Sequence, residues 1–458
     1  DAVHEGEGVA VGEDGCDLLC CEGMLSTSTM TELILKPITA IRLECPTAAN
    51  VFAFIRNHQL YSIDRAEAST YADLFRFLNS GFAVLVLDGA DSALVFGIQG
   101  YDKRSVSEPS GEDNVMGAKD GFIEVVRVNM SLLRRRMKTP QLKLELFVKG
   151  SKSQTDLCLC YMADRVPQSL IAQIKARLDE MELESILSSG YLQPFLENRR
   201  GCLFDTVGTT QRPDVLCAKL LEGRVGLLID GTPFALVIPK LFCESFQTMD
   251  DYCYRPAYAT LVRWIKYAAF LVAVLLPALY VAIALHHPEL LNRTLLLILA
   301  DAEENAPISL TAEAIGVLLV YEIIREAGLR LPKAVGGAVS IVAGLIIGDA
   351  AVASGLISTP MLTVTAIAVI AGFVVPDLAQ SITLLRLAFL LIAGFWGLFG
   401  ISLLGAAVLF NLCAGESFGF PITAPIAPLY KKGFRDTLTR VSFRKMQSGS
   451  FTVEEYHE

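Results

Sequence analysis

The sequence predicts an α/β cytoplasmic N-terminal region of two related subdomains, followed by a polytopic α-helical membrane domain. Apolar residues are concentrated after Trp264, whereas the residues before it carry an ordinary mixture of charged and apolar side chains. Two strand-turn-strand stretches in the first half resemble each other. A Gly-rich apolar stretch, Leu331 to Leu356, is long enough to cross a bilayer as a helix at 1.5 Å per residue.

The totals agree with this division. The chain has 458 residues, of which 52% are hydrophobic, and its mean hydropathy is +0.46, which is high for a soluble protein. The formal net charge of −10 argues against a protein that binds nucleic acid.

The stretch from Leu331 to Leu356 is the central predicted helix of the second half of the chain. Small residues recur at every fourth position on one face of the predicted helix: Gly336, Ser340, Gly344 and Gly348. A neighbouring backbone can approach such a face closely, so the glycines are predicted helix-packing residues. Asp349 is costly in lipid and should face protein or water. The helix is therefore either tightly packed with an acidic residue near one interface, or it lines a path for ions or solutes.

The two similar stretches each contain an Asp-Gly turn between apolar strands. GFAVLVLDGADSALVFGI (81–98) and GRVGLLIDGTPFALVIPK (223–240) align without a gap, which indicates a weak internal repeat. The alternative is that both are unrelated Asp-Gly hairpins. An amphipathic helix is predicted near Tyr71–Leu78, and alternation predicts a strand at Leu142–Val148 paired with Asp156–Met162.

Eleven cysteines are scattered, and no pair of CxxC motifs has zinc spacing. Cys158 and Cys160 would share one face of a strand, where they could hold a ligand together or serve as small core residues. We expect reduced thiols. The first residues lack the basic start and long apolar run of a signal peptide, and we read the acidic, Gly-rich beginning as disordered.

The membrane half is predicted to contain about four spans. They are placed at Tyr267–Leu285, Leu331–Leu356, Met361–Val375 and Leu387–Cys413. The charges within 291–328 fit a broken or interfacial helix. A basic and aromatic collar lies at the start of the first span and consists of Arg263, Trp264, Lys266 and Tyr267. A basic tail follows the last span, so collar and tail are both expected to face the cytoplasm. If Leu310–Ile324 also crosses, the count becomes five and the tail inverts.

These observations divide the chain into five parts. They are an atypical or disordered segment (1–50), a first α/β subdomain (51–120), a second α/β subdomain (121–255), the transmembrane domain (262–415) and a basic cytoplasmic tail (416–458).

A family resemblance is carried by several separate motifs. EIIREAGLRLPKAVGGAVSIVAGLIIGDAAVASGLISTPML (322–362) resembles the A subunit of GerA-type spore germination receptors, with support from GAKDGFIEVVRVNMSLLRRRMKTPQLKLELFVKG (117–150), RPDVLCAKLLEGRVGLLIDGTPFALVIP (212–239) and MDDYCYRP (249–256). The resemblance implies an integral protein of the spore inner membrane with its α/β domain on the cytoplasmic or core side. It also implies a permease-like B subunit that senses nutrients, a lipoprotein C subunit, and an oligomer that opens an ion path.

The residues themselves favour a channel or receptor subunit over an enzyme. The five histidines lie in no catalytic context, and the soluble half offers no nucleophile with a base and no cofactor motif. An oligomeric ion path would place polar side chains around an axis, and the pore or gating candidates are Ser340, Asp349, Thr363, Thr365 and Glu322.

Three other functions are also compatible with the sequence. A secondary transporter would show inverted repeats of comparable spans, and a membrane-anchored scaffold would use passive spans. An accessory subunit of the spore dipicolinate channel is a near relative within the same family.

Overall fold

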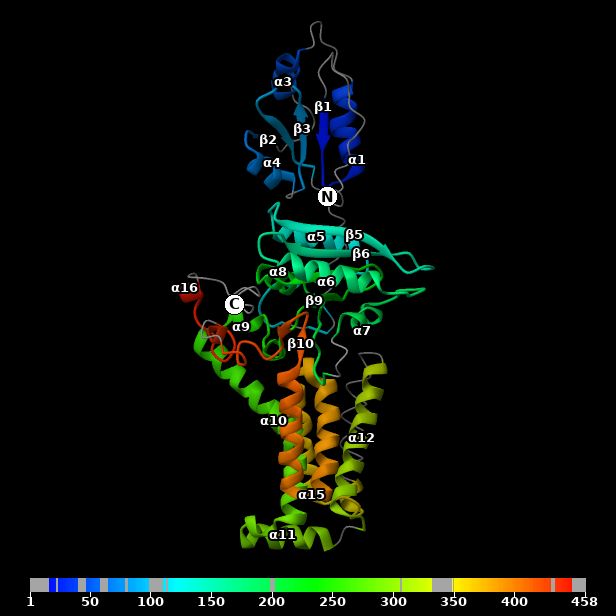
Figure 1. Cartoon of the computed structure of the whole chain (residues 1–458), viewed down its shortest axis with the longest axis vertical. Helices are drawn as coiled ribbons and strands as arrows, with labels where there is room; N and C mark the ends of the chain where they lie inside the picture. Colours follow the sequence, from blue (N-terminus) through cyan, green and yellow to red (C-terminus); the bar gives the residue numbers. More distant parts are fainter. Residues whose placement is uncertain are drawn as a thin grey trace.

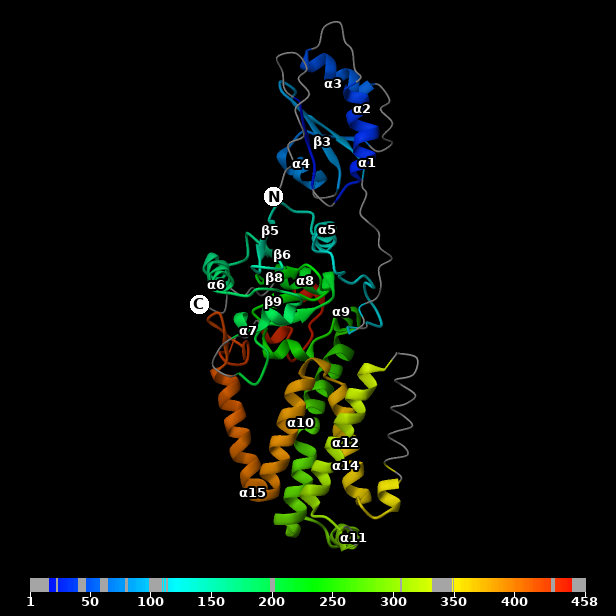
Figure 2. The same ribbon diagram turned by 90° about the vertical axis from the view of Figure 1, so that its right-hand side faces the viewer.

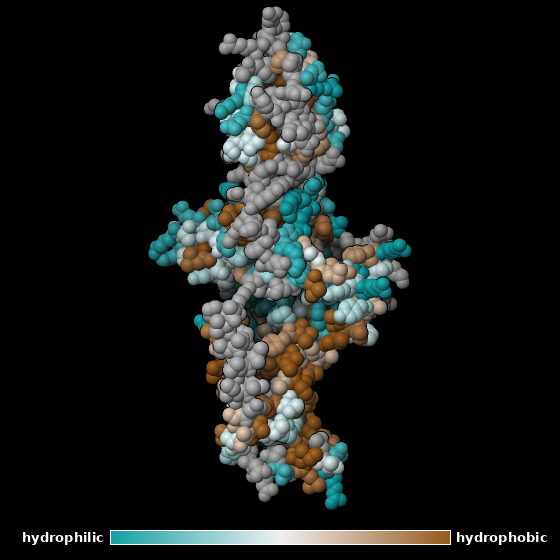
Figure 3. All heavy atoms as spheres, turned by 180° about the vertical axis from the view of Figure 1, so that it is seen from behind, coloured by the Kyte–Doolittle hydropathy of each residue, from teal (hydrophilic) through white to brown (hydrophobic). Residues whose placement is uncertain are grey.

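A computed structural model describes residues 16–21, 24–39, 47–57, 65–78, 81–98, 109, 111–112, 114–197, 202–304, 307–331, 348, 350–429 and 433–446. A small α/β unit, a larger α/β unit and a bundle of long helices follow one another along the longest axis (Figure 1). Hydrophobic side chains gather over the helical end and hydrophilic ones over the larger α/β unit (Figure 3).

The first unit is a four-stranded antiparallel sheet in the order β1-β3-β4-β2. Its strands are β1 (Cys16–Leu19), β2 (Arg65–Ala68), β3 (Ala83–Leu87) and β4 (Ala93–Phe96). Its longer helices are α3 (Ala48–Asn57) and α4 (Tyr71–Leu78), and the predicted helix and hairpin are thus confirmed. The core combines strand residues such as Leu85 and Phe96 with Val51 and Ile55 of α3.

Part of the segment 1–50, which is expected to be disordered or atypical, is folded. Residues 1–15 lie outside the described residues, but β1 pairs with β3 in full register, with Cys16 opposite Leu87. A helical stretch follows in three consecutive pieces, α1 (Thr27–Met30), η1 (Thr31–Leu35) and α2 (Lys36–Thr39). The physical reason is burial, since Ile34 and Ile38 of this stretch enter the core of the sheet.

The second unit is a five-stranded antiparallel sheet in the order β5-β6-β8-β9-β7. The strands are β5 (Leu142–Lys149), β6 (Thr155–Met162), β7 (Gly208–Thr210), β8 (Val225–Ile229) and β9 (Ala235–Ile238). One face packs on α6 (Gln168–Asp179), and the other packs on α5 (Val126–Arg136) and α8 (Pro213–Leu221). Both faces are buried, which explains why β8 is apolar throughout.

Cys158 and Cys160 are core residues. They lie on the same face of β6 with their sulfur atoms 3.8 Å apart, and both are fully buried among apolar side chains. Burial raises the pKa of the Cys160 thiol well above its usual value, so the group stays neutral. The interpretation as small core residues is therefore confirmed.

The internal repeat extends beyond the hairpins to the strands and the helix around them. In each unit a strand, a helix and a hairpin follow in order, as β2-α4-β3-β4 and as β7-α8-β8-β9. In each sheet the hairpin is central, and the earlier strands β1 and β2 flank it as β6 and β7 do.

The backbone at corresponding glycines also agrees. Gly81 and Gly223 precede the two hairpins with φ of 83° and 84°, and Gly89 and Gly231 form the turns with φ of 82° and 84°. Two unrelated Asp-Gly turns would explain the second pair alone. The two subdomains are therefore related, as the sequence predicts.

A buried charge network holds the second hairpin to its neighbours. Glu244 lies 2.5 Å from Arg224 and 2.7 Å from Lys219, and Arg224 also donates to the carbonyl oxygen of Pro239 at 2.9 Å. Burial alone would raise the pKa of Glu244, but the guanidinium of Arg224 and the ammonium of Lys219 outweigh it and lower the pKa to about 2.

Replacing the carboxylate of Glu244 should therefore destabilise the folded chain at neutral pH. A folded-state pKa below the unfolded value contributes stability above about pH 4.5, and that stability is lost as the pH falls toward 2. We expect Glu244→Gln to lower the free energy of unfolding by roughly 3 kcal/mol at pH 7. Unfolding of the detergent-purified chain, followed by circular dichroism at several pH values, measures this. Glu184→Gln, in an exposed pair with Lys152, is the control, and equal losses in both variants would refute the prediction.

The helical end contains α10 (Pro256–His286), α11 (Arg293–Glu304), α12 (Leu310–Arg330), α14 (Thr359–Phe373) and α15 (Ala379–Ala414). Among the residues that the structure describes, two helical stretches, 256–286 and 376–414, are long and apolar enough to cross a membrane. The helices α10, α12, α14 and α15 run along the long axis, whereas α11 lies across the far end (Figures 1 and 2). Most of the predicted span Leu331–Leu356 lies outside the described residues.

The stretch α15 doubles back at Gly397, where φ is +59° and ψ is −144° (Figure 2). Leu203 demonstrates the reversal, because its carbonyl accepts from Ser381 at 2.8 Å and its N–H donates to Asn411 at 2.9 Å. In a straight helix these two residues would be about 45 Å apart. The single predicted span Leu387–Cys413 is therefore two antiparallel arms joined at Gly397.

Gly397 should be intolerant of any side chain. A Cβ there would lie 2.9 Å from the Cβ of His286, in a backbone conformation that L residues rarely adopt. We expect Gly397→Ala to lower the free energy of unfolding by about 1–3 kcal/mol, measured by thermal unfolding in detergent. Gly405→Ala is the matched control on the second arm, because a Cβ there meets nothing within 4 Å. Equal stability of the two variants would contradict the assignment of the turn.

Candidate functional site

The residues predicted to pack helices or to line a pore are only partly described by the structure. Ser340, Asp349, Gly336 and Gly344 lie outside the described residues, so their predicted roles stay predictions. Gly348 is described, and a Cβ built on it would lie 3.7 Å from Leu362 of α14. Its predicted packing role is compatible with this contact but is not tested by it.

Thr363 and Thr365 do not face the same way. Thr363 is exposed and donates to the carbonyl oxygen of Thr359 at 2.9 Å, one turn earlier on α14. Thr365 is buried, and its hydroxyl has no hydrogen-bond partner among the described residues. Residues two apart on a helix point about 200° apart, so at most one of them can face a common axis. Their roles in a pore stay predictions.

Glu322 is the centre of a charge network between α12 and α15. Its carboxylate lies 2.7 Å from Arg325 and 3.0 Å from Arg386, and it accepts from the hydroxyl of Thr383 at 3.1 Å. The side chain of Arg386 is only 4% exposed, so it depends on this carboxylate for its counter-charge. The network brings two cations and one anion together and therefore carries a net positive charge.

Sequence reasoning named Glu322 but missed Arg386. The available signal was a single arginine inside the apolar run ITLLRLAFLL (382–391), since a charge in such a run almost always faces a partner.

A second acidic residue, Glu313, lies in the first turn of α12. Glu313 is 1% exposed and accepts from both the N–H and the hydroxyl of Ser358, at 2.6 and 2.8 Å. Ser358 is the N-cap of α14, so this carboxylate accepts from one of the backbone N–H groups that a helix start leaves without an acceptor. The contact joins α12 to α14.

A buried cluster of charged side chains lies where α10 leaves the larger α/β unit. Asp251, in the short helix α9 (Asp250–Cys253), is 1% exposed and bonds Nε of Arg263 at 2.9 Å. Lys266 lies 3.4 Å from the same carboxylate and donates to the hydroxyl of Thr248 at 3.0 Å. Arg263 and Lys266, expected to form an interfacial collar, are instead buried ion-pair partners.

The tail completes this site. Asp436, just after the single turn η6 (Gly433–Arg435), lies 3.0 Å from Arg263 and accepts from the hydroxyl of Tyr252 at 2.7 Å. Its backbone carbonyl accepts from the amide of Gln247 at 2.7 Å. We call Asp251, Tyr252, Arg263, Lys266 and Asp436 the juxtamembrane clasp. Its two carboxylates balance its two cations.

The tyrosine of the clasp acts only as a hydrogen-bond donor. Burial, together with the carboxylate of Asp436, raises the pKa of Tyr252 well above its usual value. Asp251 and Tyr252 both belong to the motif MDDYCYRP, which carried part of the family resemblance. The contribution of the tail was missed, because no local pattern links residues that are this far apart in the sequence.

Known proteins place the chain in one family. The family described as Bacillus/Clostridium GerA spore germination protein matches residues 6–450. The chain therefore belongs to the GerA family of spore germination proteins.

Individual relatives agree. The chain is 39% identical to spore germination protein KA of Bacillus subtilis (strain 168) over 380 residues, which cover 82% of this chain and 70% of that protein. It is 31% identical to spore germination protein B1 of the same organism over 429 residues, or 93% of this chain and 88% of that protein. It is thus a germination receptor subunit of the A-subunit type.

One solved structure is also similar. It is the crystal structure of the N-terminal domain of the A subunit of the Bacillus megaterium spore germinant receptor GerK3, with a TM-score of 0.39 and 26% identity, covering 52% of this chain and 88% of that chain.

The clasp makes a specific prediction. Asp436→Asn removes one of two anions that balance Arg263 and Lys266, and leaves buried positive charge. We expect the free energy of unfolding to fall by about 2 kcal/mol and the tail after residue 430 to become sensitive to limited proteolysis, read by mass spectrometry. Asp179→Asn, whose side chain is 74% exposed beside Lys149, is the control. A tail as protected in Asp436→Asn as in the control would show that the clasp does not hold it.

Proposed function

We propose that this chain is a subunit of a nutrient-responsive spore germination receptor that forms an oligomeric ion-conducting path. The path opens when a nutrient binds a permease-like B subunit, and a lipoprotein C subunit completes the receptor. The chain sits in the spore inner membrane with its α/β units on the cytoplasmic or core side. The family membership carries this proposal.

Two features of the molecule support a gated path. The juxtamembrane clasp joins the larger α/β unit, α10 and the tail through buried charges, so a movement on one side of the membrane boundary is transmitted to α10. The bundle also holds the Glu322 network, and charges inside membrane bundles are generally functional.

Potassium release from spores tests the proposal. Spores that lack this chain are exposed to a panel of amino acids and sugars, and we expect release to one nutrient to disappear and to return when the chain and its partner subunits are restored. Unchanged release to every nutrient would refute the receptor assignment. If dipicolinate export slowed instead, the accessory subunit of the dipicolinate channel would replace it.

Glu322→Gln should alter ion flux. The substitution leaves Arg386 and Arg325 without their shared anion inside the bundle. We expect the rate of nutrient-triggered potassium release to change by about tenfold or more in spores that contain equal amounts of the chain.

Glu326→Gln is the matched control on the same helix, because Glu326 is half exposed and pairs only with Arg330 in the described contacts. Equal release from the two variants would exclude the Glu322 network from gating.

A further inference from the structure

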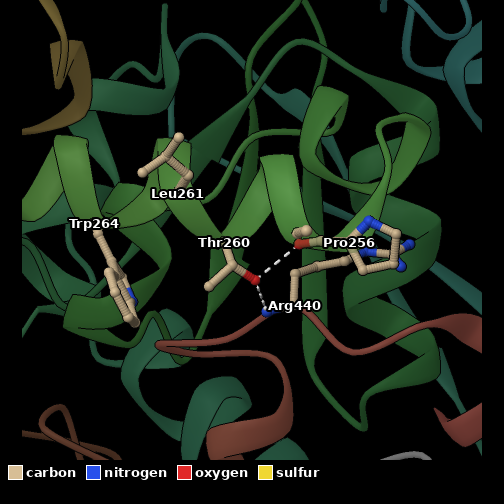
Figure 4. A pocket seen from close by; sticks show the side chains of 6 residues that line it. Pro256, Thr260, Leu261, Trp264 and Arg440 are labelled. Atoms are coloured by element: carbon tan, nitrogen blue, oxygen red, sulfur yellow. Dashed lines mark hydrogen bonds between the residues drawn. The ribbon is translucent and has the colours of Figure 1, made fainter.

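The first turn of α10 and the tail border an open surface cavity of about 400 Å³. It is lined by Pro256, Ala257, Thr260, Leu261, Trp264 and Arg440 (Figure 4). Two hydrogen bonds fix its walls: the indole N–H of Trp264 donates to the carbonyl of Leu438 at 2.9 Å, and the N–H of Arg440 donates to the hydroxyl of Thr260 at 3.0 Å. The cavity is thus a built feature of the contact between helix and tail.

Arg440 brings a buried positive charge to this cavity. The residue is 4% exposed, and its guanidinium donates to the carbonyls of Tyr252 and Val441, at 3.2 and 3.0 Å. The guanidinium also lies over the rings of Phe443 and Tyr252, 4.4 and 5.5 Å from their centroids, but neither carbonyls nor rings neutralise its charge. Among the described residues no carboxylate pairs with it, and its Nε has no hydrogen-bond partner. A buried guanidinium without an anion is unfavourable, so the site favours an anionic ligand.

The start of α10 adds a second attraction for an anion. The N-cap, Arg255, provides no side-chain hydrogen bond to the helix, and the first intrahelical bond from a backbone N–H is that of Ala259. The N–H of Ala257, in the cavity wall, is therefore among those that the helix itself leaves without an acceptor. The positive end of the helix dipole lies at the same place.

The opposite wall is apolar and continues toward the membrane. Leu261 and Trp264 are 54% and 56% exposed, and the apolar surface extends along α10 through the exposed side chains of Ile265 and Leu271. A free inorganic anion would leave this surface uncovered. An amphiphile with an anionic head would satisfy Arg440 and cover the apolar wall together.

We propose that this cavity binds the phosphate headgroup of an anionic phospholipid, with the glycerol and upper acyl region against Leu261 and Trp264. The bound lipid fixes the start of α10 and the tail at the membrane surface. The proposal rests on α10 crossing the bilayer, which is part of the proposed function.

Native mass spectrometry of the full detergent-purified chain tests this with two probes, phosphatidylglycerol and phosphatidylcholine. We expect tighter binding of phosphatidylglycerol to the unmodified chain. Arg440→Gln should weaken that binding about tenfold, the effect of losing a charge-assisted hydrogen bond, and leave phosphatidylcholine unaffected.

A second variant tests the same site in case Arg440→Gln does not fold. Ala257→Asp places a carboxylate at the start of α10, where negative charge favours the helix, yet it competes with the lipid phosphate for Arg440. It should abolish the preference for phosphatidylglycerol. Ala172→Asp, at an exposed position of α6, adds the same charge elsewhere and should keep the preference.

Each contrary outcome identifies its cause. Equal binding of the two lipids, or an unchanged preference in both variants, overturns the proposal. If an equal concentration of inorganic phosphate displaces phosphatidylglycerol, the site binds free phosphate and the lipid assignment is wrong. Failure of the unmodified chain to enter phosphatidylcholine nanodiscs refutes the membrane crossing itself, and so separates the proposed function from the lipid site.

Discussion

The buried pairing of Arg263 with Asp251 and Asp436 is the interaction on which the arrangement of this molecule depends. Arg263 is fully buried, and its two acidic partners come from the end of the α/β region and from the tail. A buried guanidinium needs such partners, since removing one leaves a charge that neither water nor protein compensates. Stacking of Phe246 on Tyr267, with ring centroids 4.1 Å apart, adds an apolar contact across the same boundary.

The two α/β units share one architecture but differ in how they connect to the helices. Both units place a hairpin at the centre of an antiparallel sheet, but only the second continues into α10. Its hairpin is anchored by the Glu244 network, which fixes the start of the segment leading to Asp251. The polar contacts of Glu244 thus hold the hairpin of the second unit close to the connection with the helices.

Much of this fold follows from local pattern, and the departures have physical reasons. The hairpins, Tyr71–Leu78 and the helical nature of the second half were predictable because alternation, turns and hydropathy are local signals. The reversal at Gly397 was not, because an apolar run reads alike whether it is straight or folded. For the candidate site, Glu322 could be named from its charge among apolar residues. Its pairing with Arg386, and that of Asp436 with Arg263, are contacts between distant segments, which no window of sequence reveals.

The reversal of α15 has a consequence for the whole helical region. A straight helix of 36 residues would carry the chain about 54 Å away from the α/β region and strand the tail at the far end. Because the second arm returns, Asp436 can reach Arg263 near the start of α10. The region thus begins and ends at one place, and its two ends are joined there by an ion pair. An outward movement of α10 or of the second arm of α15 therefore puts load on this ion pair.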